Sequence, residues 1–524
     1  MGEEQMLNGG FSINDAELKT IEEFNFDTSK TDTMYQMFRN CTNLSKLDLS
    51  KFDTSSCTDF TGIFSSCANL ASVDVSKFDT SKANSMRSMF FKCGSLKSLD
   101  LHNFNTSNVT TMRTMFSQCS GLTSLDLSNF DTSKVNSMGA MFQGCRGLTS
   151  LDLSNFDTSN VTEIAAMFSY CSNLVSLDLS NFDTSQVTNM DRVFYGCSNL
   201  ATLNISNWNV SKVPKFRDMF SYCNNLTSLN LSNWDTSQVT DMSSMFSGYG
   251  GLISLDLSNW NTSQVIDMES MFNSCSGLTS LDLSNFDTSK VTNMSNMFAN
   301  CDSLTSLDLS NFDTSKVTDM NSMFRDCDGL DSLNVSNWDT SQVTDMSWML
   351  CDCRGLASLD LSNFDTSKVT DMGRMFLRCS GLTSLNLSNW NTSQANYLTD
   401  MFSGCISLTT LDLGNWNISK AKIISDMFNG CSSLTSLDLS SWDTSQVINM
   451  ESMFNSCSGL TSLDLSNWVL GAVYTTNMFM DCTSLSSIKI NDEASANKLI
   501  ARIQDDLSKT ATWDSETKII TIHG

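Results

Sequence analysis

The stretch NFDTSKVTNMSNMFANCDSLTSLDLS, residues 285–310, decides the fold because it recurs along almost the whole chain. An aromatic residue stands at position 26 and at every further multiple of 26 up to 468, which marks 18 repeats. A unit repeated at a fixed period buries its apolar side only against neighbouring copies, so such chains fold as stacked coils. The sequence therefore predicts one solenoid over residues 26–490.

Two patterns lie inside this unit. Residues 307–309, Leu-Asp-Leu, alternate apolar and polar, which is typical of a short strand with its leucines inward. Four further apolar residues are spaced three, four and three apart, which favours one face of a short helix: Val291, Met294, Phe298 and Cys301. We expect an α/β, leucine-rich-repeat-like solenoid with one short parallel strand plus one short helix in each repeat.

The ends of such a stack must differ from its middle, because a terminal coil exposes its core unless something covers it. The spacing shortens by one residue in the last repeat, where Cys457 is followed by Cys482. Residues 491–508 then have the pattern of a helix and residues 518–522 that of a strand. We predict a C-terminal helix-plus-strand cap over 491–524 and an N-terminal cap over 1–25.

The amino-acid composition argues against several classes of function. The chain has 57 acidic residues against 31 basic ones, a formal charge of −26, which argues against nucleic acid as a partner. Its only histidines are His102 and His523, so neither a Ser/His/Asp set nor a histidine metal site can be assembled. There is no phosphate-binding loop. We expect no enzyme and name no catalytic residue.

The phrase MFxxCxxLxxLDLSNFDTSxVTxM, with Leu304-x-x-Leu307-x-Leu309 inside it, resembles the 26-residue repeat of BspA-like leucine-rich-repeat bacterial surface proteins. That family includes lipoproteins of mycoplasmas and Listeria-type bacteria. The resemblance covers about residues 26–490. It implies a secreted or surface-anchored binding protein, often linked to adhesion, without general enzymatic activity. The implied partner is a protein or glycan on another cell or matrix.

The chain as written has no export signal, no lipid anchor and no stretch near the 18 apolar residues of a membrane span. We therefore expect no membrane insertion. An intracellular or particle-associated structural rod stays open as the alternative to a surface adhesin.

We call one position of the repeat, followed through all the repeats, a column. Two columns are expected to be buried in the core. Seventeen of the 19 cysteines share one column, while Cys57 and Cys351 lie outside it. We interpret them as reduced core thiols, with disulfides between neighbouring coils and a metal or redox role as alternatives. The aromatic column, which includes Trp208 and Trp234, is expected to pack in the core rather than to stack on sugars.

Two acidic columns are expected outside. The first follows the strands and includes Asp126, Asp152, Asp178, Asp256, Asp282 and Asp308. We interpret it as a solvated face, with calcium binding as the alternative because Ca²⁺ prefers carboxylate oxygens. The second column precedes each Thr-Ser pair, and there the carboxylate is expected to close a turn on its own backbone: Asp27, Asp53, Asp131 and Asp157.

Irregular repeats give the best candidate for a local site. Tyrosines fall in four consecutive repeats, beside the only proline, Pro214. Because Tyr and Arg are favoured anchors of binding surfaces, we predict a patch made by Tyr170, Tyr195, Tyr222, Tyr249, Lys215 and Arg217. The alternative is a solvent-facing column without function.

Overall fold

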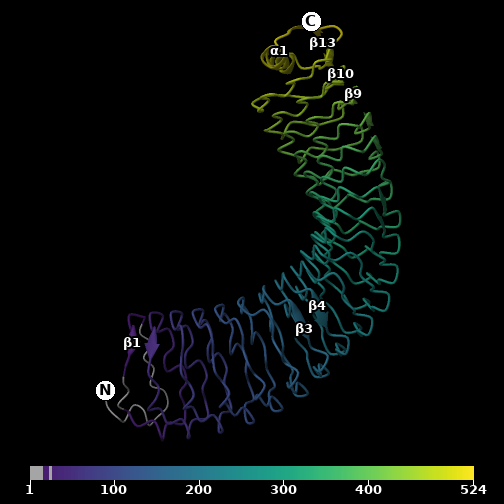
Figure 1. Cartoon of the computed structure of the whole chain (residues 1–524). Helices are drawn as coiled ribbons and strands as arrows, with labels where there is room; N and C mark the ends of the chain where they lie inside the picture. Colours follow the sequence, from purple (N-terminus) through teal and green to yellow (C-terminus); the bar gives the residue numbers. More distant parts are fainter. Residues whose placement is uncertain (1–15, 23–25) are drawn as a thin grey trace. The chain divides into compact units, whose positions relative to one another are not determined.

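The computed structural model describes residues 16–22 and 26–524. Their contacts divide the chain into two units, Met1–Gln264 and Val265–Gly524. Within each unit, successive coils lie side by side, one repeat after another (Figure 1). The predicted solenoid of 26-residue repeats is confirmed.

The Leu-Asp-Leu segments line one side of the coils, which we call the strand face, and in some coils they form short parallel strands. In the first unit these strands are β1 (Thr20–Ile21), β2 (Lys46–Leu47), β3 (Ser176–Asp178) and β4 (Thr202–Asn204). β3 and β4 pair in parallel with Leu177 opposite Leu203, one repeat apart. Leu177 is buried while the residues on either side of it are exposed, as the alternating pattern predicts.

The second unit repeats this arrangement with longer ladders near its end. Its parallel strands are β5 (Ser306–Asp308), β6 (Ser332–Asn334), β7 (Ser384–Leu385), β8 (Thr410–Leu411), β9 (Ser436–Asp438), β10 (Ser462–Asp464) and β11 (Ser487–Lys489). β5 and β6 pair with Leu307 opposite Leu333. At the last step Leu463 lies opposite Ile488, so the shortened final repeat keeps its leucine position in register.

The short helix predicted in each repeat is wrong. Among residues 16–22 and 26–524, α1 (Glu493–Leu507) is the only α-helix. The segment 293–301 is instead a run of turns, and we call the side formed by this segment and its equivalents the turn face. The four predicted inward residues are nevertheless fully buried: Val291, Met294, Phe298 and Cys301.

The backbone explains why no helix forms there. Asn296 and Asn300 have positive φ, 55° and 58°, and the equivalent positions do so in coil after coil. Residues in this left-handed conformation direct alternate N–H groups toward the next coil. In an α-helix, by contrast, each N–H donates to the carbonyl four residues earlier. The amides of Met294, Asn296 and Phe298 thus donate to carbonyls of the next coil, at 3.1, 2.8 and 2.9 Å.

Buried side chains add further ladders between coils. Phe90, Phe116 and Phe142 stack with ring centroids 5.9 Å apart at each step. The hydroxyl of Thr106 donates to the Asp131 carbonyl and accepts from the Asp131 amide, both at 2.8 Å. Since this residue pattern repeats, neighbouring coils are joined through their cores even where no strand pairing links them.

The cysteine column is such a ladder. All 19 cysteines are buried, which confirms the prediction that they lie in the core. The Cys119 thiol donates to the Phe90 carbonyl of the preceding coil at 3.0 Å. Burial raises the pKa of the Cys145 thiol to about 12. The aromatic column is inside too, as predicted, with Trp208 and Trp234 each 2 % exposed.

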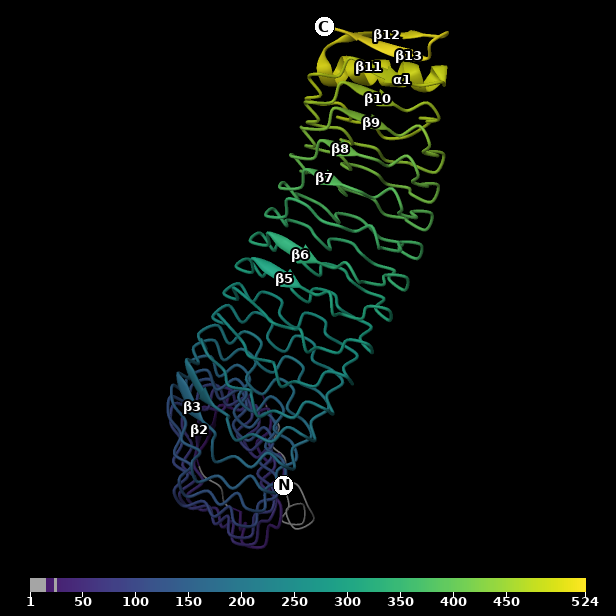
Figure 2. The same ribbon diagram turned by 90° about the vertical axis from the view of Figure 1, so that its right-hand side faces the viewer.

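The chain ends in α1 and the strands β12 (Thr510–Asp514) and β13 (Ile519–His523), which lie beyond β11 (Figure 2). β13 pairs antiparallel with β11 and with β12, giving the sheet order β12-β13-β11-β10-β9. At the other end, most of the predicted N-terminal cap lies outside the described residues. Within 16–22, Thr20 pairs with Lys46 as the strand of one more coil.

Candidate functional site

The strand face presents the predicted row of carboxylates. All six named aspartates are exposed: Asp126, Asp152, Asp178, Asp256, Asp282 and Asp308. Each also closes a local turn, which the sequence predicts only for the second acidic column. In Asp126, for example, Oδ1 accepts the Ser128 amide at 3.0 Å, and in Asp308 it accepts the Ser310 amide at 3.0 Å. The second column forms the turns predicted for it, as Asp131 does with the Ser133 amide at 3.0 Å.

These turns hold the carboxylates in the charged form. Hydrogen bonds from the Ser128 amide and hydroxyl lower the pKa of Asp126, although the neighbouring Asp100 opposes the shift. Over the described residues, no three His, Cys, Asp or Glu side chains are grouped to hold a metal ion. Calcium binding by this face stays a prediction.

A shallow hollow crosses the strand face in the second unit. It measures about 510 Å³ over β7 to β9, and its lining includes Ser384, Asp412 and Asp438. A second hollow of about 330 Å³ adjoins it over β9 to β11 and shares Asp438. Both linings combine hydroxyl and carboxylate groups with leucines of the strands, such as Leu385 and Leu437.

Three of the four predicted tyrosines meet on the turn face of the first unit. The rings of Tyr170 and Tyr195 lie edge to face with centroids 5.0 Å apart, and those of Tyr195 and Tyr222 do so at 5.5 Å. Tyr170 is 40 % and Tyr222 is 48 % exposed. Burial and the hydroxyl of Tyr170 raise the pKa of Tyr195 to about 12, so the phenol of Tyr195 stays protonated at neutral pH.

Tyr249 does not belong to this surface. It is fully buried, and it occupies the position that cysteine fills in neighbouring coils. Its ring centroid lies 6.5 Å from that of Phe246 in the core. The predicted patch is therefore smaller by one residue, because column position outweighs residue type in deciding which side chain points outward.

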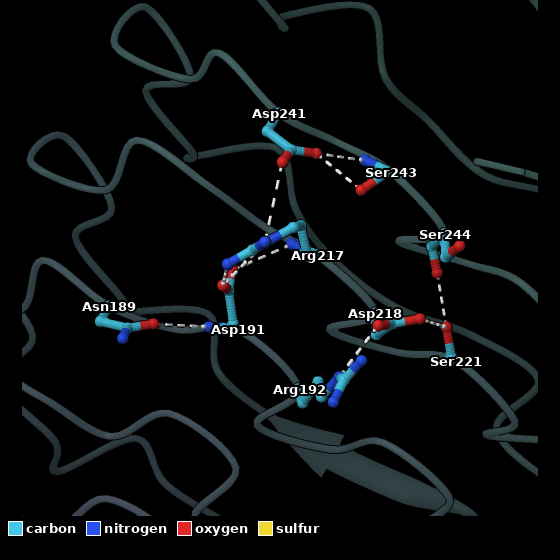
Figure 3. Close-up of polar contacts among 9 residues, drawn as sticks. All are labelled: Asn189, Asp191, Arg192, Arg217, Asp218, Ser221, Asp241, Ser243 and Ser244. Atoms are coloured by element: carbon cyan, nitrogen blue, oxygen red, sulfur yellow. Dashed lines mark hydrogen bonds and ion pairs between the residues drawn. The ribbon is translucent and has the colours of Figure 1, made fainter. Parts of the chain in front are cut away.

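Arginines and aspartates of neighbouring coils form a ladder of ion pairs (Figure 3). The Arg217 guanidinium lies between two coils, 2.6 Å from Asp191 and 3.7 Å from Asp241. The hydrogen bond to Asp191 is the main cause that raises the pKa of Arg217. Arg192 makes the parallel contact to Asp218 at 3.0 Å.

Arg192 connects the ladder to the aromatic rings. Its guanidinium carbon lies 5.8 Å from the centroid of Tyr195, and that of Arg146 lies 5.7 Å from the centroid of Tyr170. Lys215 is exposed on the same coil as Arg217. The structure thus brings Tyr170, Tyr195, Tyr222 and Arg217 into one contact network and adds Arg146 and Arg192 to it.

A second aromatic cluster, in the other unit, was missed by the sequence reasoning. The guanidinium carbons of Arg325 and Arg374 both lie 4.8 Å from the ring centroid of Trp348. Arg374 also contacts Asp400 at 3.1 Å. A signal was available, since Trp348 is the only tryptophan of residues 26–490 outside the multiples of 26.

Beside Trp348 lies a buried carboxylate. The side chain of Asp352 is 7 % exposed and contacts Arg354 at 2.7 Å and Arg378 at 3.4 Å. The Cys351 thiol donates to its second oxygen at 3.2 Å. Because these charges compensate one another, we interpret the cluster as a clamp between coils.

The described residues hold no helix with the length and apolar character of a membrane span. The fold is a leucine-rich-repeat-like solenoid, because its strands pair in parallel register and its repeats bury apolar columns and expose polar ones. Proteins of this class generally provide scaffolds for binding. The chain belongs to the family described as "Mycoplasma protein of unknown function, DUF285". Overlapping matches to this family run from 5–121 to 407–510. The expected relationship to a mycoplasma repeat family is confirmed.

Solved structures of similar fold include the functional domain of InlJ from Listeria monocytogenes, described as including a cysteine ladder. It is 17 % identical, with 82 % of this chain and 84 % of that one covered and a TM-score of 0.27. The TLR13–ssRNA13 complex is 16 % identical, covers 68 % and 72 %, and has a TM-score of 0.16. The Drosophila Toll–Spatzle complex is 15 % identical, covers 83 % and 56 %, and has a TM-score of 0.23. No curated protein matches the sequence.

Proposed function

We propose that the chain is a non-enzymatic binding scaffold, displayed at a cell surface or secreted, that contacts a protein or glycan on another cell or matrix. One observation carries the proposal. Coil after coil presents the same Ser-Asp-Ser sequence in the same register on the strand face, as in the exposed Ser306 and Asp308 and the half-buried Ser310. A partner that spans several coils meets several equivalent contacts, and their joint effect greatly exceeds that of one.

The charge of this face favours some partners over others. From 121 to 133, and in the equivalent strand segments as far as 470, the sequence contains aspartate and asparagine but no lysine or arginine. Such a surface repels phosphate backbones and suits a partner with basic or hydroxyl groups. Nucleic acid is therefore not the proposed partner.

A direct experiment compares two faces of the purified full chain. A panel of immobilised probes, namely fibronectin, collagen, a mucin-type glycoprotein and heparin, would be tested with wild type and with Asp126→Lys, Asp152→Lys, Asp178→Lys. A control variant carries the same charge change on exposed loops away from the strands. We expect the strand-face variant alone to lose binding. Equal binding by all three proteins would contradict the proposal.

Protease shaving of intact source cells tests the location. Peptides of the repeats released while cytosolic markers stay inside would support surface display. Repeats released only by lysis would favour the second candidate, a structural rod inside a cell or particle. The observation in favour of that candidate is the set of 19 cysteines buried in the core, because reducing compartments keep cysteines as thiols whereas oxidising ones favour disulfides.

A further inference from the structure

The strand β12 forms the outer edge of the C-terminal sheet. Among the residues that the structure describes, β12 pairs with β13 alone, and it stands last in the order β12-β13-β11-β10-β9. Figure 2 shows it beyond β13, at the far end of the second unit. An edge strand presents a row of backbone N–H and C=O groups with which another strand can pair. β12 therefore offers a surface to which a strand can be added.

The pairing of β13 shows which backbone groups of β12 face outward. The amide of Ile522 donates to the carbonyl of the residue before β11 at 2.9 Å, so Ile522 faces β11. Because the backbone groups of successive residues alternate between the two sides of a strand, Thr521 faces β12. Thr512 lies opposite Thr521 and faces it in return. The backbone N–H and C=O groups of Ala511 and Trp513 therefore point away from β13, toward the open edge.

This edge lacks the features that usually protect edge strands, which are lysine, proline, bulges, short length or a covering segment. β12 has the sequence Thr-Ala-Thr-Trp-Asp and five residues, whereas the solenoid strands β3 and β7 have three and two. The helix α1 lies against β12. It covers one face of the strand, because Ala511 and Trp513 are half-buried while the alternate residues between and beside them are exposed. The edge itself stays available.

The two outward residues suit a second copy of the same strand. Antiparallel pairing of β12 with β12 of another copy, centred on Thr512, places Ala511 of each copy opposite Trp513 of the other. Each of these pairs exchanges two N–H···O=C bonds, so the two pairs satisfy every outward backbone group. A small side chain then lies beside a large aromatic one on the half-buried face, which is a favourable cross-strand combination.

The charges favour the same register. It places Thr510 of one copy opposite Asp514 of the other, so no two carboxylates of β12 face each other directly. Lys509 precedes β12 and Glu516 follows it, so antiparallel pairing brings opposite charges toward each other at both ends. An unrelated strand has no reason to match both the outward residues and these charges, which favours a second copy as the occupant.

We propose that two copies of the chain associate through β12 and form one continuous sheet across a two-fold axis. The inference concerns assembly, and it does not depend on which ligand the strand face binds. A dimer carries twice the number of equivalent strand-face contacts, and contacts that act together bind far more strongly than one alone. Pairing through β12 would thus extend the binding surface beyond a single chain.

Sedimentation velocity of the full-length chain, over a range of concentrations at physiological salt, measures the association. Thr512→Lys places a positive charge directly opposite its own copy on the axis. Thr521→Lys is the matched control, because Thr521 lies beside Thr512 and is equally exposed, but one strand away from the edge. We expect wild type and Thr521→Lys to dimerise alike, and Thr512→Lys to associate about fivefold more weakly.

A mixing experiment separates charge repulsion from local damage to β12. Thr512→Glu should also associate weakly by itself. An equimolar mixture of Thr512→Lys and Thr512→Glu chains should form a heterodimer at least as tight as the wild-type dimer, because opposite charges then meet on the axis. Local damage to the strand would not be repaired by mixing.

Ala511→Pro tests the backbone bonds directly. Proline removes an N–H that faces the open edge and leaves the bonds to β13 in place. We expect association about tenfold weaker or worse, with an unchanged thermal midpoint of unfolding. A lowered midpoint would show that this N–H is bonded within the chain, which contradicts the arrangement.

Wild type that stays monomeric at every concentration would overturn the inference. A dimer that Thr512→Lys and Thr521→Lys weaken equally, or one that mixing fails to restore, would place the contact elsewhere and overturn it as well. Binding to the matrix panel is measured separately, so failure of the dimer leaves the proposed function standing.

Discussion

The ring of Tyr222 lies against the backbone of Gly248, one coil further along. A Cβ at Gly248 would come within 2.5 Å of the ring's Cδ1. Tyr170 and Gly196 repeat the relationship two coils earlier, and the glycines have φ of 69° and 72°. The alternation of tyrosine and glycine in this column is therefore a packing arrangement that fixes where the exposed tyrosine side chains lie.

We expect Gly248→Ala to destabilise the first unit by about 1–3 kcal/mol, because the methyl group meets both the ring and an unfavourable backbone conformation. Chemical denaturation gives the free energy of unfolding. Gly471→Ala is the control, since a Cβ there would meet nothing within 4 Å. Equal stability of the two variants would show that the ring does not rest on Gly248.

The threonine ladder predicts a second effect. Thr106→Val removes a hydroxyl that both donates to and accepts from the backbone of Asp131, in a site with 1 % exposure. Leaving these groups unpaired should cost about 1–3 kcal/mol of unfolding free energy. Thr106→Ser keeps the hydroxyl and should therefore recover most of the lost unfolding free energy. A valine variant as stable as wild type would show that water replaces the hydroxyl.

The strand-face turns predict a dependence on pH. The pKa of Asp126 is lowered on folding, so its contribution to stability is present above its unfolded pKa and is lost as pH falls toward the folded value. Asparagine makes the same turn without titrating, as Asn230 does with the Ser232 amide at 3.1 Å. The variant Asp126→Asn, Asp152→Asn, Asp178→Asn should match wild type near neutral pH and lose less stability in acid.

Urea unfolding at neutral pH and at about pH 3, below the ordinary aspartate pKa, measures the difference. The same three positions changed to alanine provide the control, because alanine removes the acceptor at both pH values. Identical acid sensitivity of wild type and the asparagine variant would contradict the role given to these turns.

The cysteine ladder predicts slow thiol chemistry. The thiolate is the reactive form, and burial raises the pKa of thiols such as Cys145. We expect a maleimide reagent to leave all 19 cysteines of the native chain largely unmodified and to label them as denaturant unfolds the coils. Mass spectrometry counts the labels. Fast labelling of the native protein would show that the column opens without unfolding.

The repeat period, the strand and the identity of the buried columns could be predicted because they depend on apolar spacing alone. The turns that replace the expected short helix could not be predicted in this way. Val291, Met294, Phe298 and Cys301 point inward at helical spacing, yet positive φ at Asn296 produces the same spacing in a run of turns. Nothing in a polar asparagine distinguishes a left-handed turn residue from an exposed residue of a helix.

The candidate site was predictable in part for a related reason. Tyr170 and Tyr222 occupy a column that points outward, whereas Tyr249 replaces a cysteine and is buried, which its column position already indicated. The partners of the tyrosines were not predictable. Arg146 reaches Tyr170 from the preceding coil, and Arg192 reaches Tyr195 three residues further along the same coil, so both contacts depend on how the turns place the side chains.

We propose that residues 491–524 act as the C-terminal cap. The Lys498 ammonium donates to the carbonyls of Leu470, Gly471 and Val473 at 3.1, 3.0 and 2.6 Å. Lys498→Met should therefore lower the unfolding free energy by about 1–3 kcal/mol, since those carbonyls lose a charged donor. Lys422→Met, at an exposed position, is the control. Equal thermal midpoints for the two variants would count against the cap.

Most main-chain hydrogen bonds that join the turn face of one coil to the next run from an amide to a carbonyl of the following coil. In the second unit the amide of Phe428 donates to Met453, and that of Phe454 donates to Met478. Phe479 has no further coil, and its amide donates to the carboxylate of Asp506 in α1 at 2.9 Å. Aligned peptide groups of this kind sum to a macrodipole, as in a helix. The stack is thus electrically polar along its axis, and an anion is fixed where its positive pole emerges.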